Sequence, residues 1–85
     1  MPADFLMEQM EWREAIEEAR QLSDAAGLDN LESRLLHEMH GLEAQLATRI
    51  DDRQDYAAAA GDVRKLKFLG KLVEEIASAF DAIDT

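Results

Sequence analysis

The sequence predicts an all-α protein: a single three-helix bundle whose helices run up, down and up. Apolar residues recur at steps of three and four along most of the 85 residues, as in amphipathic helices. The single proline, Pro2, precedes the first periodic segment, and no segment alternates as a β-strand would. Three such helices joined by short turns bury their apolar faces in an antiparallel bundle. Residues 1–85 have the length of one domain.

The first helix is expected from about residue 4 to about residue 24. Asp4 follows Pro2 and is a candidate N-cap, because its carboxylate can accept a free backbone N–H group. Gly27, in the segment AAGLDN, is a candidate for the residue just past the helix end, where glycine adopts a left-handed conformation cheaply. At 100° per residue, one narrow arc forms the expected core face: Phe5, Trp12, Ile16 and Ala19.

The second helix is expected to begin in the segment DNLE and to end in the polar run DDRQD at 51–55. Asp29 can cap it while Glu32, three residues later, reaches back to the cap, as in a capping box. Its apolar stripe consists of Leu28, Leu31, Leu35, Met39, Leu42, Leu46 and Ile50.

The third helix is expected from about residue 55 to about residue 82. Gly41, Gly61 and Gly70 lie inside the predicted helices, where each costs about 1 kcal/mol relative to alanine. Close helix packing would account for one of these glycines. The apolar stripe of the third helix consists of Tyr56, Ala59, Val63, Leu66, Leu69, Val73, Ile76, Phe80 and Ile83.

Three large apolar residues of the first helix do not fit its core face. Met7 and Met10 point roughly opposite that face, and Leu6 lies between, so Leu6 fits either a wide core arc or the exposed side. Contiguous apolar surface is typical of protein-binding sites, and methionine adapts to a partner's shape. Carboxylates continue the same outer side: Glu11, Glu14, Glu17 and Glu18.

The third helix shows a similar anomaly at Phe68. Its side chain points away from the apolar stripe, with Leu72 beside it. Three interpretations remain open: a solvated basic face that matches acids elsewhere, a tolerated exposed aromatic, or a second part of a binding surface. The bases gathered around Phe68 are Arg64, Lys65, Lys67 and Lys71.

Composition excludes several classes of function. The chain carries 19 acidic and 9 basic residues, a net charge of −10. Nucleic acids and anionic membranes bind cationic surfaces, so neither is an expected partner, whereas a protein with a basic patch is. The chain has no cysteine, which excludes disulfides and thiolate metal sites. No segment resembles a signal peptide or a membrane span, and a soluble, reducing compartment is expected.

An enzyme is not expected either. His37 and His40 occur as H-E-M-H, one residue shorter than the zinc-protease pattern H-E-x-x-H. They could bind metal adventitiously with Glu38 or Glu43, or they could simply be two surface histidines. The carboxylates lie in a solvated stripe, not in a cleft that would separate their pKa values. We therefore expect no catalytic residue, no metal and no cofactor.

Two segments resemble the C-terminal domain of HscB-type J-domain co-chaperones of iron–sulfur cluster assembly. They are FLMEQMEWRE at 5–14 and VRKLKFLGKL at 63–72, and DYAAAA at 55–60 fits as well. The resemblance implies a three-helix bundle that binds the cluster scaffold protein IscU and presents it to the specialised Hsp70 HscA, in the bacterial cytoplasm. The J domain carries a His-Pro-Asp motif that this sequence lacks, so the resemblance implies the client-binding part alone.

The resemblance also implies which residues contact the scaffold protein. Met10 and Trp12 stand at positions where the family often has leucine, and Trp12 lies on the core face. Gly70, near Phe68, stands where the family often has an acidic residue. An alternative from another class is a helical homo-oligomerisation module that uses the same apolar stripe. The positions carried over by motif, which the helical wheel also places outside the core, are Leu6, Met7, Met10, Glu11, Glu14, Glu18 and Phe68.

Overall fold

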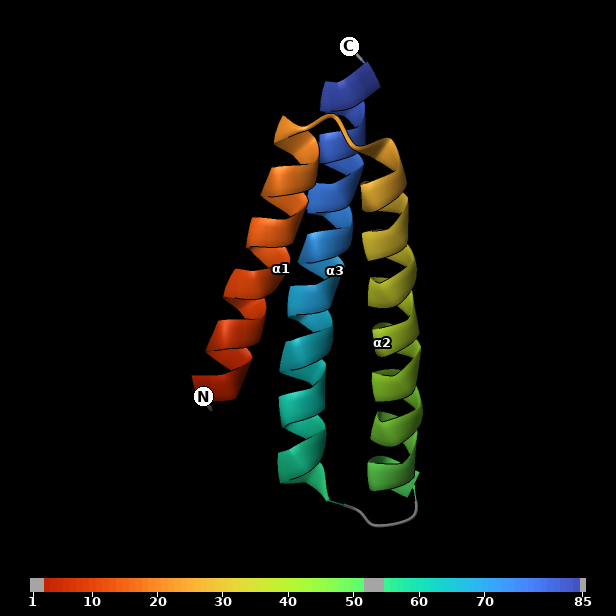
Figure 1. The fold of residues 1–85 in the computed structure, drawn as a ribbon. Helices are drawn as coiled ribbons and strands as arrows, with labels where there is room; N and C mark the ends of the chain where they lie inside the picture. The colour runs from red at the N-terminus through yellow and green to blue at the C-terminus, as the bar shows by residue number, and fades with distance from the viewer. Residues whose placement is uncertain (1–2, 52–54, 85) are drawn as a thin grey trace.

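The computed structural model describes residues 3–51 and 55–84, which form a bundle of three helices. Helix α1 spans Ala3–Gln21, α2 spans Ala25–Asp51 and α3 spans Tyr56–Asp84. They run up, down and up, so α1 and α3 are parallel (Figure 1). No strand occurs within the described ranges. The predicted all-α, up-down-up architecture is confirmed.

The turn between α1 and α2 is shorter than predicted. Ser23, with φ 52°, occupies the left-handed position expected for Gly27. The Asp24 N–H donates to the Ala19 carbonyl at 2.8 Å and the Ser23 N–H to the Arg20 carbonyl at 3.1 Å. These two bonds form a Schellman motif, which satisfies the last carbonyls of a helix.

The same turn begins α2. Asp24, not the predicted Asp29, is its N-cap, because its Oδ1 accepts the Gly27 N–H at 2.9 Å. A Cβ added at Gly27 would lie 2.4 Å from the Asp24 Oδ2, so glycine leaves room for the capping carboxylate. Asp29 and Glu32 lie inside the helix. Asp4 was likewise wrong as a cap, since α1 includes it in its first turn.

Asp55 caps α3, close to the predicted start. Its Oδ1 accepts the Ala58 N–H at 3.2 Å, and its own N–H donates to the Arg49 carbonyl at 2.8 Å. The Arg49 guanidinium reaches across to α3, where it donates to the Ala58 carbonyl and lies 3.3 Å from the Asp62 carboxylate. Asp62 is buried, at 7% exposure, so this charge pair belongs to the packing between α2 and α3.

The core lies where all three helices meet. The predicted core residues Trp12, Ile16 and Ala19 are buried, whereas Phe5 is only half-buried. Helix α3 buries two residues that the stripe missed, Leu72 and Ala79. It packs against both other helices, and a helix with two neighbours needs a wider apolar arc. The remaining buried apolar residues of the central cluster are Leu28, Leu31, Leu35, Leu42, Leu69 and Ile76.

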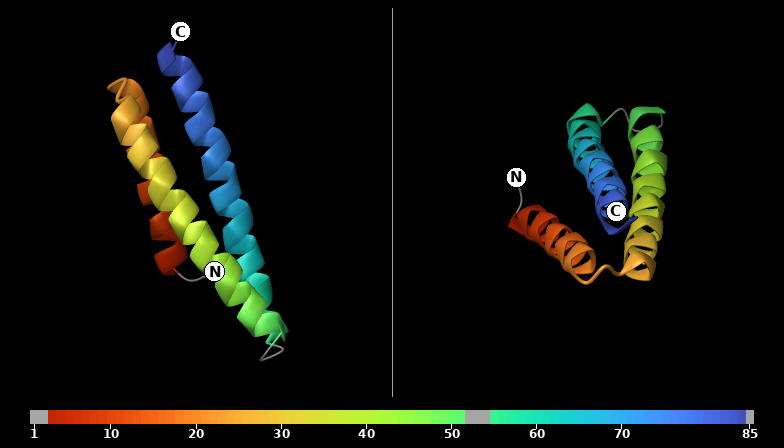
Figure 2. Two further views of the ribbon diagram at one scale, coloured as in Figure 1. Left: turned by 90° about the vertical axis from the view of Figure 1, so that its right-hand side faces the viewer. Right: turned by 90° about the horizontal axis from the view of Figure 1, so that it is seen from above.

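One end of the bundle consists of α2 and α3 alone. Helix α1 has 19 residues and α2 and α3 have 27 and 29, so the hairpin continues past the start of α1 (Figure 2). Ile50, Tyr56 and Val63 belong to the predicted stripes, yet they are 42%, 64% and 38% exposed at this end. Their prediction as core residues was wrong because no third helix covers them.

The interior glycines do not mark close helix approaches. A Cβ added at Gly41, Gly61 or Gly70 would meet no atom within 4 Å. Close packing was proposed for one of them, and this explanation is wrong for all three.

Candidate partner-binding face

The outer side of α1 carries an apolar patch. Leu6, Met7 and Met10 are 51%, 58% and 63% exposed, which resolves the alternative left open for Leu6. They share the N-terminal two turns of a helix whose other side packs on α2 and α3. Exposed, adjacent apolar residues of this kind favour contact with a second protein.

Three carboxylates extend this patch toward the C-terminal end of α1. Glu11, Glu14 and Glu18 are exposed, and within residues 3–51 and 55–84 none of them forms an ion pair. Glu17 differs, since Arg20 donates to it from Nε at 3.0 Å. The Arg20 guanidinium lowers the pKa of Glu17. The carboxyl groups of the three other acids are accessible to a cationic partner. We call the set Leu6, Met7, Met10, Glu11, Glu14 and Glu18 the α1 outer face.

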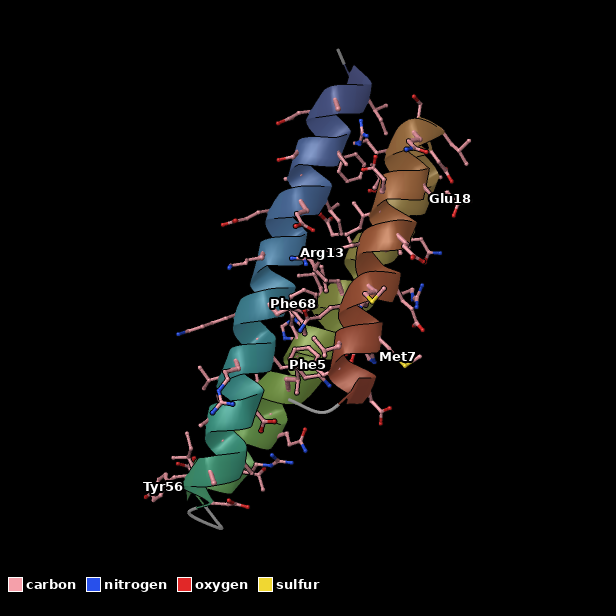
Figure 3. All side chains as sticks on the ribbon, turned by 90° about the vertical axis from the view of Figure 1, so that its left-hand side faces the viewer. Phe5, Met7, Arg13, Glu18, Tyr56 and Phe68 are labelled. Carbon is pink, nitrogen blue, oxygen red and sulfur yellow. The ribbon has the colours of Figure 1, made fainter. Side chains whose placement is uncertain are left out.

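Phe68 does not belong to that face. Phe68 and Phe5 point toward each other in the space between α1 and α3, whereas Met7 and Glu18 lie on the far side of α1 (Figure 3). The two phenylalanine rings meet edge to face, with centroids 5.7 Å apart. The Arg13 guanidinium lies 5.4 Å from the Phe68 centroid. Phe68 is half-buried, so its interpretation as a tolerated exposed aromatic was wrong.

An open groove of about 640 Å³ lies beside Phe68, between α1 and α3. Ile16 and Ala79 form its apolar floor. Charges of both signs line its sides, and Arg13 spans it to Glu75, with Nε and Oε1 3.6 Å apart. Since acids and bases alternate there, the groove shows no preference for an anion or a cation. The charged residues along it are Arg13, Glu17, Arg20, Lys71, Glu74 and Glu75.

A pair of carboxyl groups joins α1 to α2, and sequence reasoning missed it. Burial, together with a hydrogen bond and the charge of Glu8, raises the pKa of Glu38 to about 7. The hydrogen bond with Glu38, helped by nearby Lys65, lowers the pKa of Glu8. Lys65 Nζ lies 3.5 Å from Glu8 Oε2. One proton is therefore shared by the two carboxyl groups near neutral pH. Helical periodicity carries no signal for such a pair, because its members come from different helices.

The two histidines remain a minor feature. His40 is exposed and its Nδ1 lies 3.9 Å from Glu43 Oε2, while His37 is exposed as well. In the part of the chain that the structure describes, no three histidine, cysteine, aspartate or glutamate side chains gather as a metal site would require. Within the same part, no helix combines the length and apolarity needed to cross a bilayer.

Comparison with known protein families gives a specific result. Residues 1–77 match the family described as "HSCB C-terminal oligomerisation domain". A relative from Aromatoleum aromaticum, named "Co-chaperone protein HscB homolog", is 47% identical over 85 residues, all of this chain and 48% of the relative. A relative of the same name from Azoarcus sp. is 48% identical over 84 residues, which is 99% of this chain and 48% of the relative.

More distant relatives carry the same name. The protein from Neisseria meningitidis serogroup C is 46% identical over 76 residues, 89% of this chain and 45% of the relative. The chain thus spans about half the length of the curated relatives it matches. These relatives are named as co-chaperones and not as enzymes, in agreement with the non-catalytic character predicted for this chain. No solved structure matches the chain significantly.

Proposed function

The chain belongs to the family of HscB C-terminal domains, and we propose that its α1 outer face binds an IscU-type iron–sulfur scaffold protein. As part of a longer co-chaperone, the domain would deliver the scaffold to an HscA-type Hsp70 for cluster transfer. The Hsp70 would be engaged through a J domain, whose His-Pro-Asp motif does not occur in these 85 residues. The bacterial cytoplasm is the compartment that we propose.

The observation that supports docking most directly is the coincidence of apolar and acidic exposure on one side of α1. Leu6, Met7 and Met10 offer apolar anchors, and the neighbouring carboxylates are exposed and form no ion pair with the described residues. Apolar anchors near the centre of an interface supply most of the affinity. The acids would orient a basic patch of the scaffold and raise the association rate more than the affinity.

Phe68 has a more indirect part in this proposal. The Phe5–Phe68 contact and the Arg13 side chain above the ring leave only part of Phe68 accessible. A partner on the α1 side of the groove could reach that part. Truncation of Phe68 would also remove packing between α1 and α3, so Phe68→Leu, which keeps most of the apolar volume, is the variant of choice.

A triple variant tests the docking face. Leu6→Ser, Met7→Ser and Met10→Ser together should abolish calorimetric binding to the scaffold while the helical circular dichroism is retained. A matched control changes three other exposed apolar residues, Leu22, Leu36 and Ile50, to serine and should bind normally. Unchanged binding by the first variant would refute the proposed face.

The acids are tested separately by kinetics. Glu11→Gln, Glu14→Gln and Glu18→Gln should slow scaffold association and flatten its dependence on salt. An association rate that is equally salt-dependent in this variant would remove the role given to the three carboxylates.

A second candidate is self-association through the same face. The matched family is described as an oligomerisation domain, and the exposed methionines suit either kind of partner. Light scattering on the isolated chain distinguishes the two candidates, because scaffold docking requires only a monomer.

A further inference from the structure

Three bases of α3 lie on its exposed surface, and the last of them, Lys71, also lines the groove between α1 and α3. Arg64, Lys67 and Lys71 are exposed, and across the described ranges no ion pair involves them. The other described bases each contact a carboxylate or an aromatic ring. They are Arg13, Arg20, Arg34, Arg49 and Lys65.

The three bases repeat the spacing of the three unpaired acids on α1. The acids are Glu11, Glu14 and Glu18, and residues 64, 67 and 71 follow them at a constant separation of 53 positions. A helix presents residues at i, i+3 and i+7 on one side, so each set forms a straight row. The two rows have opposite charge and equal length.

The apolar residues that precede the two charged rows are also 53 positions apart. Met7 corresponds to Ala60 and Met10 to Val63, and all four side chains are exposed. If α1 lay parallel to α3 in this register, methionine would meet small apolar side chains and each acid would meet a base. We call Ala60, Val63, Arg64, Lys67 and Lys71 the α3 outer face.

The two faces cannot meet within one chain. Inside the bundle α1 and α3 contact each other through other residues, Phe5 with Phe68 and Arg13 with Glu75. Those pairs are separated by 63 and 62 positions, and the Glu8–Lys65 and Arg13–Phe68 contacts by 57 and 55. The α1 outer face lies on the side of α1 away from α3 (Figure 3), so only a second copy of the chain can bring it onto the α3 outer face.

We propose that the chain self-associates by placing the α1 outer face of one copy, in parallel, on the α3 outer face of the next. This interface deepens the second candidate function and does not depend on scaffold docking. In this register Met7 packs on Ala60, Met10 on Val63, and the carboxylates of Glu11, Glu14 and Glu18 face Arg64, Lys67 and Lys71.

The parallel direction follows from the apolar residues. An antiparallel pairing would match two of the three charges, Glu11 with Lys71 and Glu18 with Arg64, and would place Glu14 opposite residue 68. It would, however, place Met7 opposite the segment around Glu75, where charged side chains line the groove. Only the parallel register gives both methionines apolar counterparts.

This register makes the association open-ended. The intermolecular separation of 53 is two to ten residues smaller than the intramolecular separations, which run from 55 for Arg13 and Phe68 to 63 for Phe5 and Phe68. Successive copies would therefore be shifted by about 3–15 Å along the helix axis. A head-to-tail contact with such a shift does not close into a dimer. Average mass should rise steadily with concentration.

The net charge of −10 opposes association at long range. At physiological ionic strength the Debye length is about 8 Å, so charges in direct contact outweigh the distant ones. A contact formed by a few side chains from one helix of each copy is expected to be weak and transient. Self-association would also cover the residues proposed for scaffold docking, so the two events would compete.

Charge reversal tests the two faces. The native chain should gain mass in light scattering as its concentration rises to the order of 100 µM. One variant carries Glu11→Lys, Glu14→Lys and Glu18→Lys, the other Arg64→Glu, Lys67→Glu and Lys71→Glu. Each alone should remain monomeric, because its two faces then have the same sign. Their equimolar mixture should associate, since both kinds of contact regain opposite charges.

The absence of cysteine permits a test of the register by disulfide cross-linking. A mixture of Met10→Cys and Val63→Cys should form an intermolecular disulfide under mild oxidation, because the two Cα atoms must lie within about 7 Å. A mixture of Met10→Cys and Lys71→Cys should not. The reverse result would refute the parallel register.

The outcomes separate the possible failures. A native chain that stays monomeric refutes both self-association and this interface. If the native chain associates and either reversal variant still associates by itself, the proposed interface is refuted but self-association is not. A reversal mixture that stays monomeric, although both variants keep native circular dichroism, also refutes the pairing. None of these results bears on scaffold binding, which is measured with a different partner.

Discussion

The two ends of the bundle differ in what holds the helices together. Where α1, α2 and α3 all meet, apolar side chains such as Leu35, Leu72 and Ile76 have no exposed surface. Where α2 and α3 continue alone, the described contacts include the Arg49–Asp62 charge pair, and the nearby Tyr56 side chain is largely exposed. The amphipathic pattern is similar at both ends. This difference shows that the burial of an apolar side chain depends on the number of neighbouring helices as well as on the amphipathic pattern of its own helix.

The largest expected effect is at the three-helix end. Leu72→Ala removes a fully buried side chain and should lower the free energy of unfolding by about 2–5 kcal/mol. Leu46→Ala makes the same chemical change at the two-helix end, where the side chain is only half-buried, and should cost about 1 kcal/mol. Urea denaturation of both variants measures the difference. Equal losses would contradict the contrast between the two ends.

The next effect concerns the charge pair at the two-helix end. Asp62 is buried, and its Oδ2 accepts no hydrogen bond from the described residues, although it lies 3.3 Å from Arg49 Nη1. Asp62→Asn removes the charge that faces Arg49 and should destabilise the chain by about 1–3 kcal/mol. Replacing both partners, with Arg49→Met and Asp62→Leu, should restore most of that loss. A double variant that is less stable than Asp62→Asn in thermal unfolding would contradict this account.

A pH effect is expected at the boundary between the two ends, where Glu8 and Glu38 face each other. The pKa of Glu38 is about 7 in the folded chain and 4.5 ordinarily, so folding favours its protonated form. This contribution is complete below about pH 4.5 and is lost as the pH rises through 7. The Tm should therefore fall between pH 6 and pH 8. The pKa of Glu8 is lowered, so its contribution is lost only in acid.

Glu38→Gln isolates this effect. The variant cannot ionise at position 38, so its Tm should change less than the native Tm between pH 6 and pH 8. Glu32→Gln, a half-buried glutamate on the same helix, serves as the control and should keep the native pH profile. If the Tm of the native chain and the Tm of Glu38→Gln change equally with pH, the shared proton is ruled out.

The smallest expected effect is in the turn at the three-helix end. Ser23 has φ 52°, a conformation that costs a non-glycine residue energy. Ser23→Gly should stabilise the chain by about 0.5 kcal/mol after the greater freedom of glycine in the unfolded chain is subtracted. Ser33→Gly, in the interior of α2, should destabilise by about the same amount. Differential scanning calorimetry can resolve the opposite shifts in Tm.

Much of the candidate site could be predicted from the sequence. The helical wheel placed Met7 and Met10 outside the core, and both are exposed. It could not place Phe68, because the wheel of one helix does not show that α1 packs against that side of α3. The cap of α2 was misplaced for a related reason. Asp24 and Asp29 are both plausible caps by composition, and the Schellman turn at Ser23 selects Asp24.

The sequence by itself determined three amphipathic helices, their order and the apolar and acidic composition of the α1 outer face, because these follow from local periodicity. The tertiary structure decided how far along each predicted stripe, and over how wide an arc, the apolar residues are buried. Helix α1 is too short to cover Ile50, Tyr56 and Val63, and α3 has two neighbours, so Leu72 is fully enclosed. The tertiary structure also brought Glu8 and Glu38 together. Such contacts join residues far apart in the chain, and their distances depend on how whole helices pack.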